Sequence, residues 1–301
     1  YLMIEIWIPI TIFAAFSQNL RSIYQKKLQK NMSNISSTYT RFLFGLPFVL
    51  IYFLFLYNFS NSKFLVSNIN TTFLLYCLIG GISQIIATLL LLKIFKTNNF
   101  SVATSYSKTE PIQAAFFGFI LLSDPISFIG LIGIIIGLIG IMITSIKKNN
   151  LRINFFNLSV FYGLLSGSLF GLSAVLFRGA SHSLFSIDYM LTSSFTLLIA
   201  IVIQTLILTF YILLTDIKQF YLLYFNWKDG LIVGFFGAFA SICWFYAMSV
   251  QNVAYVRALG QIELIFTILA SILYFKEKII ANEILGVLII LIGILIILFN
   301  I

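Results

Sequence analysis

Charged side chains are scarce in this sequence: Asp, Glu, Lys and Arg together make up only 9% of its 301 residues. A soluble domain carries roughly 25% of such residues. Apolar residues account for 60% of the chain, which is more than the interior of a soluble fold of this length can hide. The composition therefore excludes a soluble protein and predicts one that exposes apolar side chains to a lipid bilayer.

Side chains that ligate metals or act as nucleophiles are equally few. Cys77 and Cys243 are the two cysteines, and both lie inside apolar runs, so we expect no disulfide framework. His182 is the one histidine and cannot form a metal site alone. The sequence contains no phosphate-binding loop, no paired-Asp motif and no Ser–His constellation. We therefore expect a protein that is not an enzyme and that uses no metal or cofactor.

The chain is instead rich in long apolar runs separated by short polar breaks. Each run reaches or slightly exceeds the ~20 residues that a helix needs to cross a bilayer core of ~30 Å. The runs lie near residues 4–24, 38–58, 72–94, 100–122, 126–146, 158–178, 187–214, 229–250, 254–275 and 281–300. The sequence therefore predicts an all-α integral membrane protein with ten transmembrane helices in one bundle.

The sequence also repeats itself at an offset of 153 residues. At this offset Glu110 aligns with Glu263, Gly133 with Gly286, and Gly140 with Gly293. Each repeat holds five predicted helices, and an odd number makes the second repeat cross the membrane in the opposite direction. We therefore predict two inverted five-helix repeats, residues 1–150 and 151–301, which is the architecture of alternating-access transporters.

Two motifs add a resemblance to a known family. Lys108-Thr109-Glu110-Pro111 runs into Leu121-Leu122-Ser123-Asp124-Pro125, and Gly260-Gln261-Ile262-Glu263 runs into Tyr274-Phe275-Lys276-Glu277-Lys278. Over nearly its whole length the chain resembles the EamA-type members of the drug/metabolite transporter superfamily, in which an acidic residue closes the fourth and ninth helices. The resemblance implies transport of amino acids, metabolites, cofactors or drugs, and it does not specify which.

Basic residues are unevenly distributed between the two sides of the predicted bundle. The odd-numbered connections carry Lys26, Lys27, Lys30, Lys93, Lys96, Lys147, Lys148, Arg152, Lys218, Lys228, Lys276 and Lys278, and the even-numbered ones carry little beyond Lys63. The positive-inside rule then places both termini outside. The habit of the resembled family places both termini in the cytoplasm, so the two arguments disagree on orientation. Because the basic residues are spread over these gaps, we expect no nucleic-acid partner.

Two buried acids are the leading site candidates. Glu110 and Glu263 lie near the centres of the fourth and ninth predicted spans, where an ionisable group is costly unless it faces a wet cavity or a partner. They are candidates for contacting a cationic or zwitterionic substrate or for exchanging protons. The alternative is that they pair with basic residues and hold the helices in register, the available bases being Lys108, Arg41, Arg178 and Arg257. Pro111 predicts either a hinge or a static bend.

Other polar or aromatic residues within the spans complete the predicted substrate-binding set. The full set is Glu110, Glu263, Gln261, Lys108, Gln18, Asn19, Gln84, Trp244, Tyr246 and Arg257. Because lysine and arginine accompany the acids, the walls of the two repeats should differ in charge.

These observations together favour a secondary active transporter in the cell (inner) membrane. The predicted solute is a small amino acid, amine or related polar or amphipathic metabolite, moved by alternating access with proton coupling or exchange. The alternative is a passive facilitator or pore, and an intramembrane enzyme fits the sequence worse. We expect the lipid bilayer and a small solute as partners, and a monomer or a dimer as the assembly.

Overall fold

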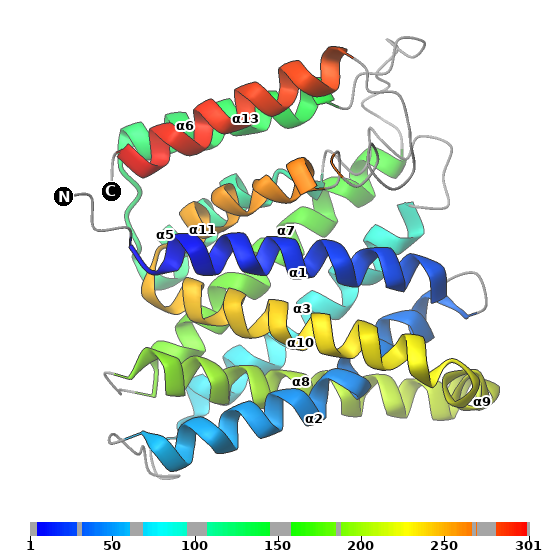
Figure 1. Cartoon of the computed structure of the whole chain (residues 1–301). Helices are drawn as coiled ribbons and strands as arrows, with labels where there is room; N and C mark the ends of the chain where they lie inside the picture. The colour runs from blue at the N-terminus through cyan, green and yellow to red at the C-terminus, as the bar shows by residue number, and fades with distance from the viewer. Residues whose placement is uncertain are drawn as a thin grey trace. The chain divides into compact units, whose positions relative to one another are not determined.

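The computed structural model describes residues 5–28, 32–60, 69–94, 107–144, 158–184, 188–266, 269 and 281–299, and every regular element among them is helical (Figure 1). The helices are α1 (Trp7–Leu28), α2 (Asn34–Phe59), α3 (Thr71–Ile94), α5 (Glu110–Leu122), α6 (Phe128–Thr144), α7 (Leu158–His182), α8 (Tyr189–Thr215), α9 (Lys218–Phe225), α10 (Trp227–Val250), α11 (Val253–Leu259), the 3₁₀ helix η2 (Gly260–Ile262) and α13 (Ala281–Phe299). The prediction of an all-helical chain is confirmed for this part of the sequence.

Several residues used in the sequence argument lie outside the described part of the chain. They are Lys30, Lys63, Lys96, Lys147, Lys148, Arg152, Tyr274, Phe275, Lys276, Glu277 and Lys278.

Six helices are long and apolar enough to cross a membrane by length and composition: α2, α3, α7, α8, α10 and α13. Helices α5 and α6 are apolar but shorter. The membrane-spanning class of protein is thereby confirmed, while the number of ten spans stays a prediction.

Helix α9 was not predicted from the sequence. Its eight residues are too short to span a bilayer, and Tyr221, Tyr224 and Phe225 are 65%, 74% and 62% exposed. Exposed aromatic rings on a short helix are typical of the membrane–water interface, where the rings sit at the level of the headgroups. The aromatic residues between the predicted seventh and eighth spans therefore belong to a helix and not to a simple loop.

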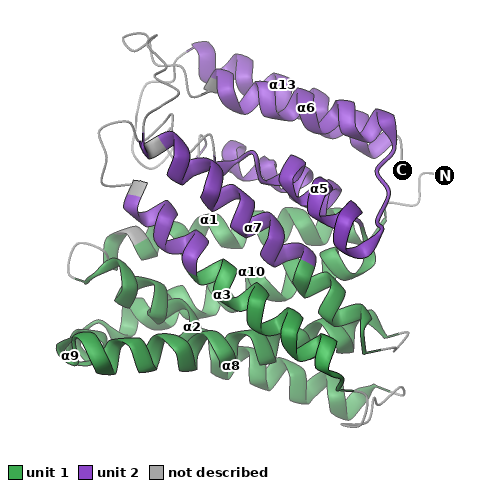
Figure 2. Ribbon diagram, turned by 180° about the vertical axis from the view of Figure 1, so that it is seen from behind, with its two compact units in different colours: residues 1–85, 176–251 green, residues 86–175, 252–301 purple. Residues whose placement is uncertain are grey.

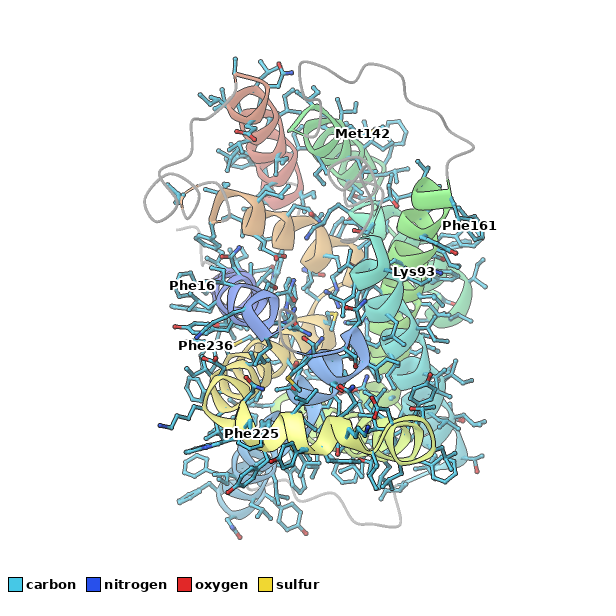
Figure 3. All side chains as sticks on the ribbon, turned by 90° about the vertical axis from the view of Figure 1, so that its right-hand side faces the viewer. Phe16, Lys93, Met142, Phe161, Phe225 and Phe236 are labelled. Carbon is cyan, nitrogen blue, oxygen red and sulfur yellow. The ribbon has the colours of Figure 1, made fainter. Side chains whose placement is uncertain are left out.

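Large apolar side chains cover much of the outer surface. Phe16, Phe161 and Phe225 are 45%, 58% and 62% exposed and project away from the helices that carry them (Figure 3). Exposed apolar surface on this scale indicates a face that contacts the membrane, because exposing it to water would be energetically costly. The hydrophobic effect therefore does not distinguish inward from outward faces here, and small residues decide which faces pack.

The chain forms two compact units, shown in different colours in Figure 2. Unit 1 comprises residues 1–85 and 176–251, and unit 2 comprises residues 86–175 and 252–301, so the division falls within α3 and α7.

Within unit 1, helices α1 and α2 both pack against α10. Close approach to α2 depends on Gly234 of α10, where an added Cβ would lie 2.5 Å from the carbonyl carbon of Phe44. Helix α1 runs antiparallel to α10, because Lys27 pairs with Asp229 at one end while Gln18 contacts Trp244 further along. In lipid the hydrophobic effect does not drive helices together, so close backbone contact at glycine contributes to helix association instead.

Within unit 2, helices α6 and α13 cross through two pairs of glycines. A Cβ on Gly133 would lie 2.9 Å from the carbonyl oxygen of Gly293, and a Cβ on Gly140 would lie 2.7 Å from that of Gly286. The offset of 153 residues converts one contact into the other, since it maps Gly133 to Gly286 and Gly140 to Gly293. The internal repeat detected in the sequence therefore corresponds to a repeated, antiparallel contact in the fold.

Candidate functional site

The two motifs that carry Glu110 and Glu263 depart from regular α-helical hydrogen bonding at matching positions. Ser107 is helical, Lys108 and Thr109 form a turn, and α5 begins at Glu110. In the second repeat α11 ends at Leu259, η2 occupies Gly260–Ile262, and residues 263–266 are again helical. The 153-residue offset places the turn at Lys108–Thr109 on the last two residues of η2. Each glutamate is thus the first α-helical residue after such a departure.

This arrangement corrects the sequence interpretation of the fourth span. The continuous run predicted over 100–122 put Glu110 inside a helix and Pro111 at a bend. Instead Pro111 occupies the first turn of α5, with Thr109 as the residue before the helix. A proline is favourable there, because the first-turn N–H that it lacks would have no helical partner. Pro111 therefore starts a helix and does not kink one.

The two glutamates are paired crosswise with basic residues of the opposite motif. Arg257 Nε of α11 lies 3.0 Å from Glu110 Oε1, and both side chains are 12% exposed. Lys108 Nζ lies 3.2 Å from Glu263 Oε2, with 29% and 14% of the side chains exposed. The four charges cancel within the cluster. Lys108 and Arg257, two of the four bases that the sequence offered as partners, thus pair with the acids within unit 2.

The two acids occupy equivalent positions of the internal repeat, whereas the two bases do not. Lys108 aligns with Gln261, and Arg257 aligns with Thr104, which is outside the described residues. Helix α11 packs against α5, so the two motifs lie side by side in unit 2. The predicted difference in charge between the two repeats is therefore present within this cluster, because each repeat contributes its base from a different position.

A carboxylate at the start of a helix also interacts with the helix dipole. The unpaired N–H groups of the first turn place partial positive charge there, which stabilises an anion by about 0.3–1 kcal/mol at an exposed site. Glu110 occupies this position in α5. Glu110 is therefore stabilised in two ways, by its ion pair with Arg257 and by the partial positive charge at the start of α5.

Two glutamine side chains of unit 2, Gln261 and Gln113, each have a buried carbonyl oxygen that could accept a hydrogen bond. Gln261 donates from Nε2 to the carbonyl of Arg257 at 3.2 Å, and Gln113 donates from Nε2 to the carbonyl of Leu164 at 3.4 Å. The Oε1 atoms of both glutamines are buried and accept no hydrogen bond from the described part of the protein. A buried acceptor is costly without a donor, so a water or a bound solute is expected there. Gln113 was not among the predicted binding residues.

The remaining predicted residues belong to unit 1. Trp244 of α10 donates from Nε1 to Gln18 Oε1 of α1 at 3.1 Å, which brings two of the candidates together. Asn19 of α1 is buried, and Tyr246 of α10 is half-buried. Residues two apart on a helix point in different directions, so Tyr246 does not share the face of Trp244.

Gln84 of α3 accepts a hydrogen bond of 2.8 Å from Gln204 Nε2 of α8, and the same Nε2 lies 3.3 Å from the carbonyl of Gly81. This contact joins two helices within unit 1. The sequence analysis missed Gln204, although an amide in the middle of an apolar span was a visible signal.

Within unit 1, Arg178 and Arg41 both contact α10 or its C-terminal end. Arg178 Nη1 donates to the carbonyls of Met248 at 2.6 Å and Gln251 at 2.8 Å, so it caps the C-terminal end of α10. Arg41 Nη2 donates to Ser241 Oγ at 3.4 Å.

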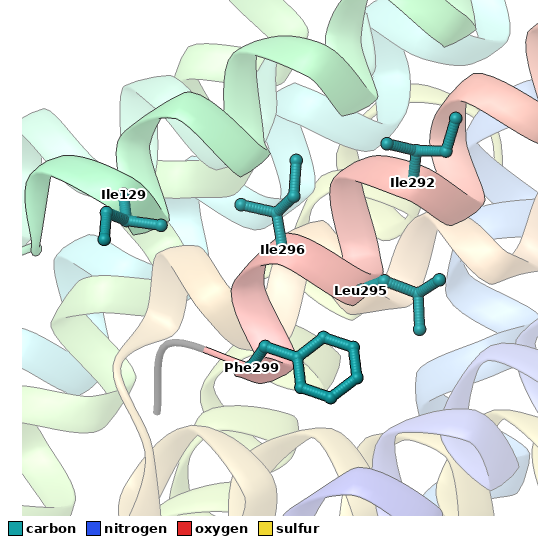
Figure 4. A pocket seen from close by; sticks show the side chains of 5 residues that line it. All are labelled: Ile129, Ile292, Leu295, Ile296 and Phe299. Atoms are coloured by element: carbon teal, nitrogen blue, oxygen red, sulfur yellow. The ribbon is translucent and has the colours of Figure 1, made fainter.

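A hollow between α6 and α13 of unit 2 is unsuited to a polar solute. It measures about 330 Å³ and is lined by Ile129 of α6 and by four residues of α13: Ile292, Leu295, Ile296 and Phe299 (Figure 4). All five side chains are hydrocarbon, so the hollow offers no hydrogen bond. Its chemistry matches lipid acyl chains.

Apolar spanning helices, a 153-residue repeat and matching helix breaks around buried charges define a polytopic membrane protein of the transporter type. The sequence profile of the EamA-like transporter family matches residues 5–146 and again residues 157–299. The chain therefore belongs to the EamA-like transporter family, within the drug/metabolite transporter superfamily.

A comparison with solved structures supports the fold. One crystal structure, titled only as that of a protein, superposes with a TM-score of 0.66 over 97% of this chain and 96% of the other, at 13% sequence identity. At this identity the likeness concerns the fold alone. No curated protein sequence matches the chain significantly.

Proposed function

We propose that the chain is a secondary active transporter of a small polar or amphipathic metabolite and that it works by alternating access. The observation that carries the proposal is the pair of departures from regular α-helix, a turn at Lys108–Thr109 and a 3₁₀ turn at Gly260–Ile262, each followed by a glutamate. Discontinuous helices at equivalent positions of two repeats are where transporters of several folds bind solute and coupling ions.

The proposed architecture is ten transmembrane helices arranged as two inverted repeats, residues 1–150 and 151–301. Two observations support it: the family profile matches twice, and the α6–α13 contact maps onto itself at the 153-residue offset while the helices run antiparallel. An inverted pair of repeats can exchange conformations, which is the structural basis of alternating access.

In this mechanism the crossed ion pairs act as the element that rearranges. Lys108–Glu263 and Arg257–Glu110 each join the fourth-span motif to the ninth-span motif, so a relative movement of the two motifs must loosen both pairs. Protonation of a carboxylate would weaken its pair and ease that movement. Glu263 and Glu110 are therefore the candidates for proton coupling, and solute exchange without protons is the other form of the mechanism.

The proposed binding residues are the predicted ones, with Gln113 added. The acid cluster with Gln261 supplies one group of contacts, and the side chains of α1, α3 and α10 (Gln18, Asn19, Gln84, Trp244 and Tyr246) supply another.

The proposed location is the cell (inner) membrane, as a monomer or a dimer. Orientation is open between the charge rule, which places both termini outside, and the family habit, which places them inside. Single-cysteine variants at Lys148 and Ser123, labelled from each side in inverted and intact vesicles, decide between the two. Reaction of position 148 from the cytoplasmic side supports the charge rule, and reaction of position 123 from that side supports the family habit.

Flux into proteoliposomes tests the function. The purified chain is reconstituted and offered labelled amino acids and amines, with empty liposomes as the control. A transporter gives saturable uptake and counterflow, in which unlabelled solute trapped inside drives labelled solute inward. Flux that rises linearly with concentration and shows no counterflow identifies a passive facilitator instead and refutes alternating access.

A further inference from the structure

Helix α9 runs across the two helices that it connects. It follows α8 and precedes α10 within unit 1, and it is seen end-on in Figure 1 and along its length in Figure 3. Helices α8 and α10 are both long and apolar enough to cross the bilayer. A short helix that runs across their ends therefore lies in the plane of the membrane surface, as interfacial helices do.

The inner side of α9 is fixed to α2. Gln219 Oε1 accepts a hydrogen bond of 2.6 Å from Ser36 Oγ, and the ring of Phe220 meets that of Tyr39 edge-on, with centroids 6.0 Å apart. Leu223, four residues after Gln219, is buried. These three residues of α9 share one side of the helix. The fold therefore determines which side of α9 faces outward.

The outward side of α9 and its flanking residues is aromatic and exposed. Ile217, Tyr221 and Tyr224 follow one another at helical spacing and are 65%, 65% and 74% exposed. Phe225 and Trp227, which are 62% and 46% exposed, extend this surface toward α10. Tyrosine and tryptophan combine an apolar ring with a polar group, which suits the headgroup layer of a bilayer better than water or acyl chains. These five residues form the α9 face.

A lysine lies at each end of the α9 face. Lys218 is the first residue of α9, Lys228 belongs to the first turn of α10, and both are exposed. The Nζ atom of Lys228 lies 5.8 Å from the centre of the Trp227 ring, so the cation and the aromatic surface are neighbours. The α9 face therefore combines aromatic rings with positive charge at both ends.

The carboxylates beside these lysines are already engaged. Both carboxylate oxygens of Asp216 accept hydrogen bonds from the first turn of α9, and Asp229 lies 3.1 Å from Lys27. Among the described residues neither Lys218 nor Lys228 forms an ion pair. The two ammonium groups are thus available to an anion from outside the chain.

We propose that the α9 face, with Lys218 and Lys228, binds the phosphate groups of anionic membrane lipids. The aromatic rings hold the helix at the depth of the headgroups, where a lysine meets the lipid phosphates. Each lysine near a negatively charged membrane surface contributes an attraction that corresponds to about a fivefold change in binding. The inference concerns the lipid around the protein and does not depend on the proposed transport function.

Quenching of tryptophan fluorescence by brominated lipids tests the proposal. Of the three tryptophans, Trp7 and Trp244 are 3% and 6% exposed, whereas Trp227 belongs to the α9 face. Bromine on a lipid acyl chain quenches tryptophan by contact, so the quenching reports on Trp227. Trp227→Phe should remove most of the quenching, which checks this reporter.

The full chain is reconstituted into phosphatidylcholine vesicles that contain a minor fraction of brominated phosphatidylglycerol or the same fraction of brominated phosphatidylcholine. The ratio of quenching by the two lipids measures the local enrichment of the anionic lipid. We expect phosphatidylglycerol to be enriched at least about fivefold at low salt. The enrichment should fall as salt is added, because salt screens exposed charges.

The variants separate the charge of the lysines from the packing of the helix. Lys218→Gln and Lys228→Gln should each lower the enrichment by about fivefold and leave quenching by brominated phosphatidylcholine unchanged. Lys218→Arg and Lys228→Arg keep the charge and should retain the enrichment. Lys93→Gln is the matched control, because it removes an equal, exposed charge from the end of α3 in unit 2, and it should change nothing.

Each outcome decides the inference. Equal quenching by the two lipids overturns it, as does quenching by neither lipid or an enrichment that is insensitive to both lysines. Loss of the enrichment when glycerol 3-phosphate is added at constant ionic strength assigns the lysines to a soluble phosphate and also overturns it. Lysine-dependent enrichment in a preparation without saturable flux supports the lipid site and refutes the transport function instead.

Discussion

Replacing Arg257 by glutamine would leave the Glu110 carboxylate without the partner that lies 3.0 Å away. Both side chains of this pair are only 12% exposed, so solvent cannot take over the role of the partner. Removing one member of a buried ion pair costs about 3–5 kcal/mol, because the remaining charge stays buried. We therefore expect Arg257→Gln to lower the free energy of unfolding by about that amount.

The double variant Glu110→Gln with Arg257→Gln should recover part of this loss. Both charges are then gone, and the two amides can still hydrogen-bond to each other. A double-mutant cycle should give a coupling energy of about 1–3 kcal/mol between the two positions. The Lys27–Asp229 pair serves as the matched control: its side chains are 64% and 27% exposed, so its own cycle should give about 0–1 kcal/mol.

Reversible unfolding in mixed dodecylmaltoside–SDS micelles measures these quantities. The midpoint and slope of the transition give the free energy for the wild-type chain, the two single variants and the double variant. Strict additivity at positions 110 and 257 would falsify the assignment of the pair as a coupled, buried contact. A coupling at Lys27–Asp229 as large as that at the buried pair would show that exposure does not govern the difference.

Three further predictions concern packing, backbone conformation and coupling. Gly133→Ala should lower the free energy of unfolding by about 1–3 kcal/mol, because the new Cβ would lie 2.8 Å from Ile297 Cγ1. Gly137→Ala is the control and should be neutral or slightly stabilising, because its Cβ meets nothing within 4 Å. Unfolding in mixed micelles measures both, and equal losses of stability would contradict the glycine-contact argument. Ser123 has a φ of 53°, a left-handed conformation that glycine adopts without strain and a β-branched residue does not. Ser123→Gly should therefore raise the free energy of unfolding by about 0.5–1 kcal/mol, and Ser123→Val should lower it. The unfolding midpoints of the two variants measure this, and a valine variant more stable than the glycine variant would contradict backbone strain at this residue. Glu263→Gln should abolish flux driven by a pH gradient while solute exchange continues in the same proteoliposomes, and unchanged gradient dependence would exclude this carboxylate as the coupling group.

Much of the architecture could be predicted from the sequence. The shortage of charge excluded a soluble fold, since a chain that is 60% apolar has no aqueous surface to present. The offset of 153 residues identified Glu110 with Glu263 and Gly133 with Gly286, and the same offset relates the glycine contacts of α6 and α13. Such conclusions follow from composition and spacing alone.

The pairing within the site could not be predicted in this way. In a soluble helix the apolar face indicates which way the helix is turned, but in lipid the outer and inner faces are both apolar, so that signal is lost. The sequence therefore named four bases as possible partners for the acids, and only the tertiary structure showed that Lys108 pairs with Glu263 and Arg257 with Glu110.

The sequence by itself thus determined the membrane class, the repeat and the acids, because these depend on which residues occur and at what spacing. The tertiary structure decided where the helices break and which charges meet. Glu110 begins α5 instead of lying inside a longer helix, since Lys108 and Thr109 form a turn before it. Glu110 and Arg257 are about 150 positions apart in the sequence, so their contact depends on how their helices are rotated and how closely they approach. Packing at small residues sets both quantities, and it exists only in the folded chain.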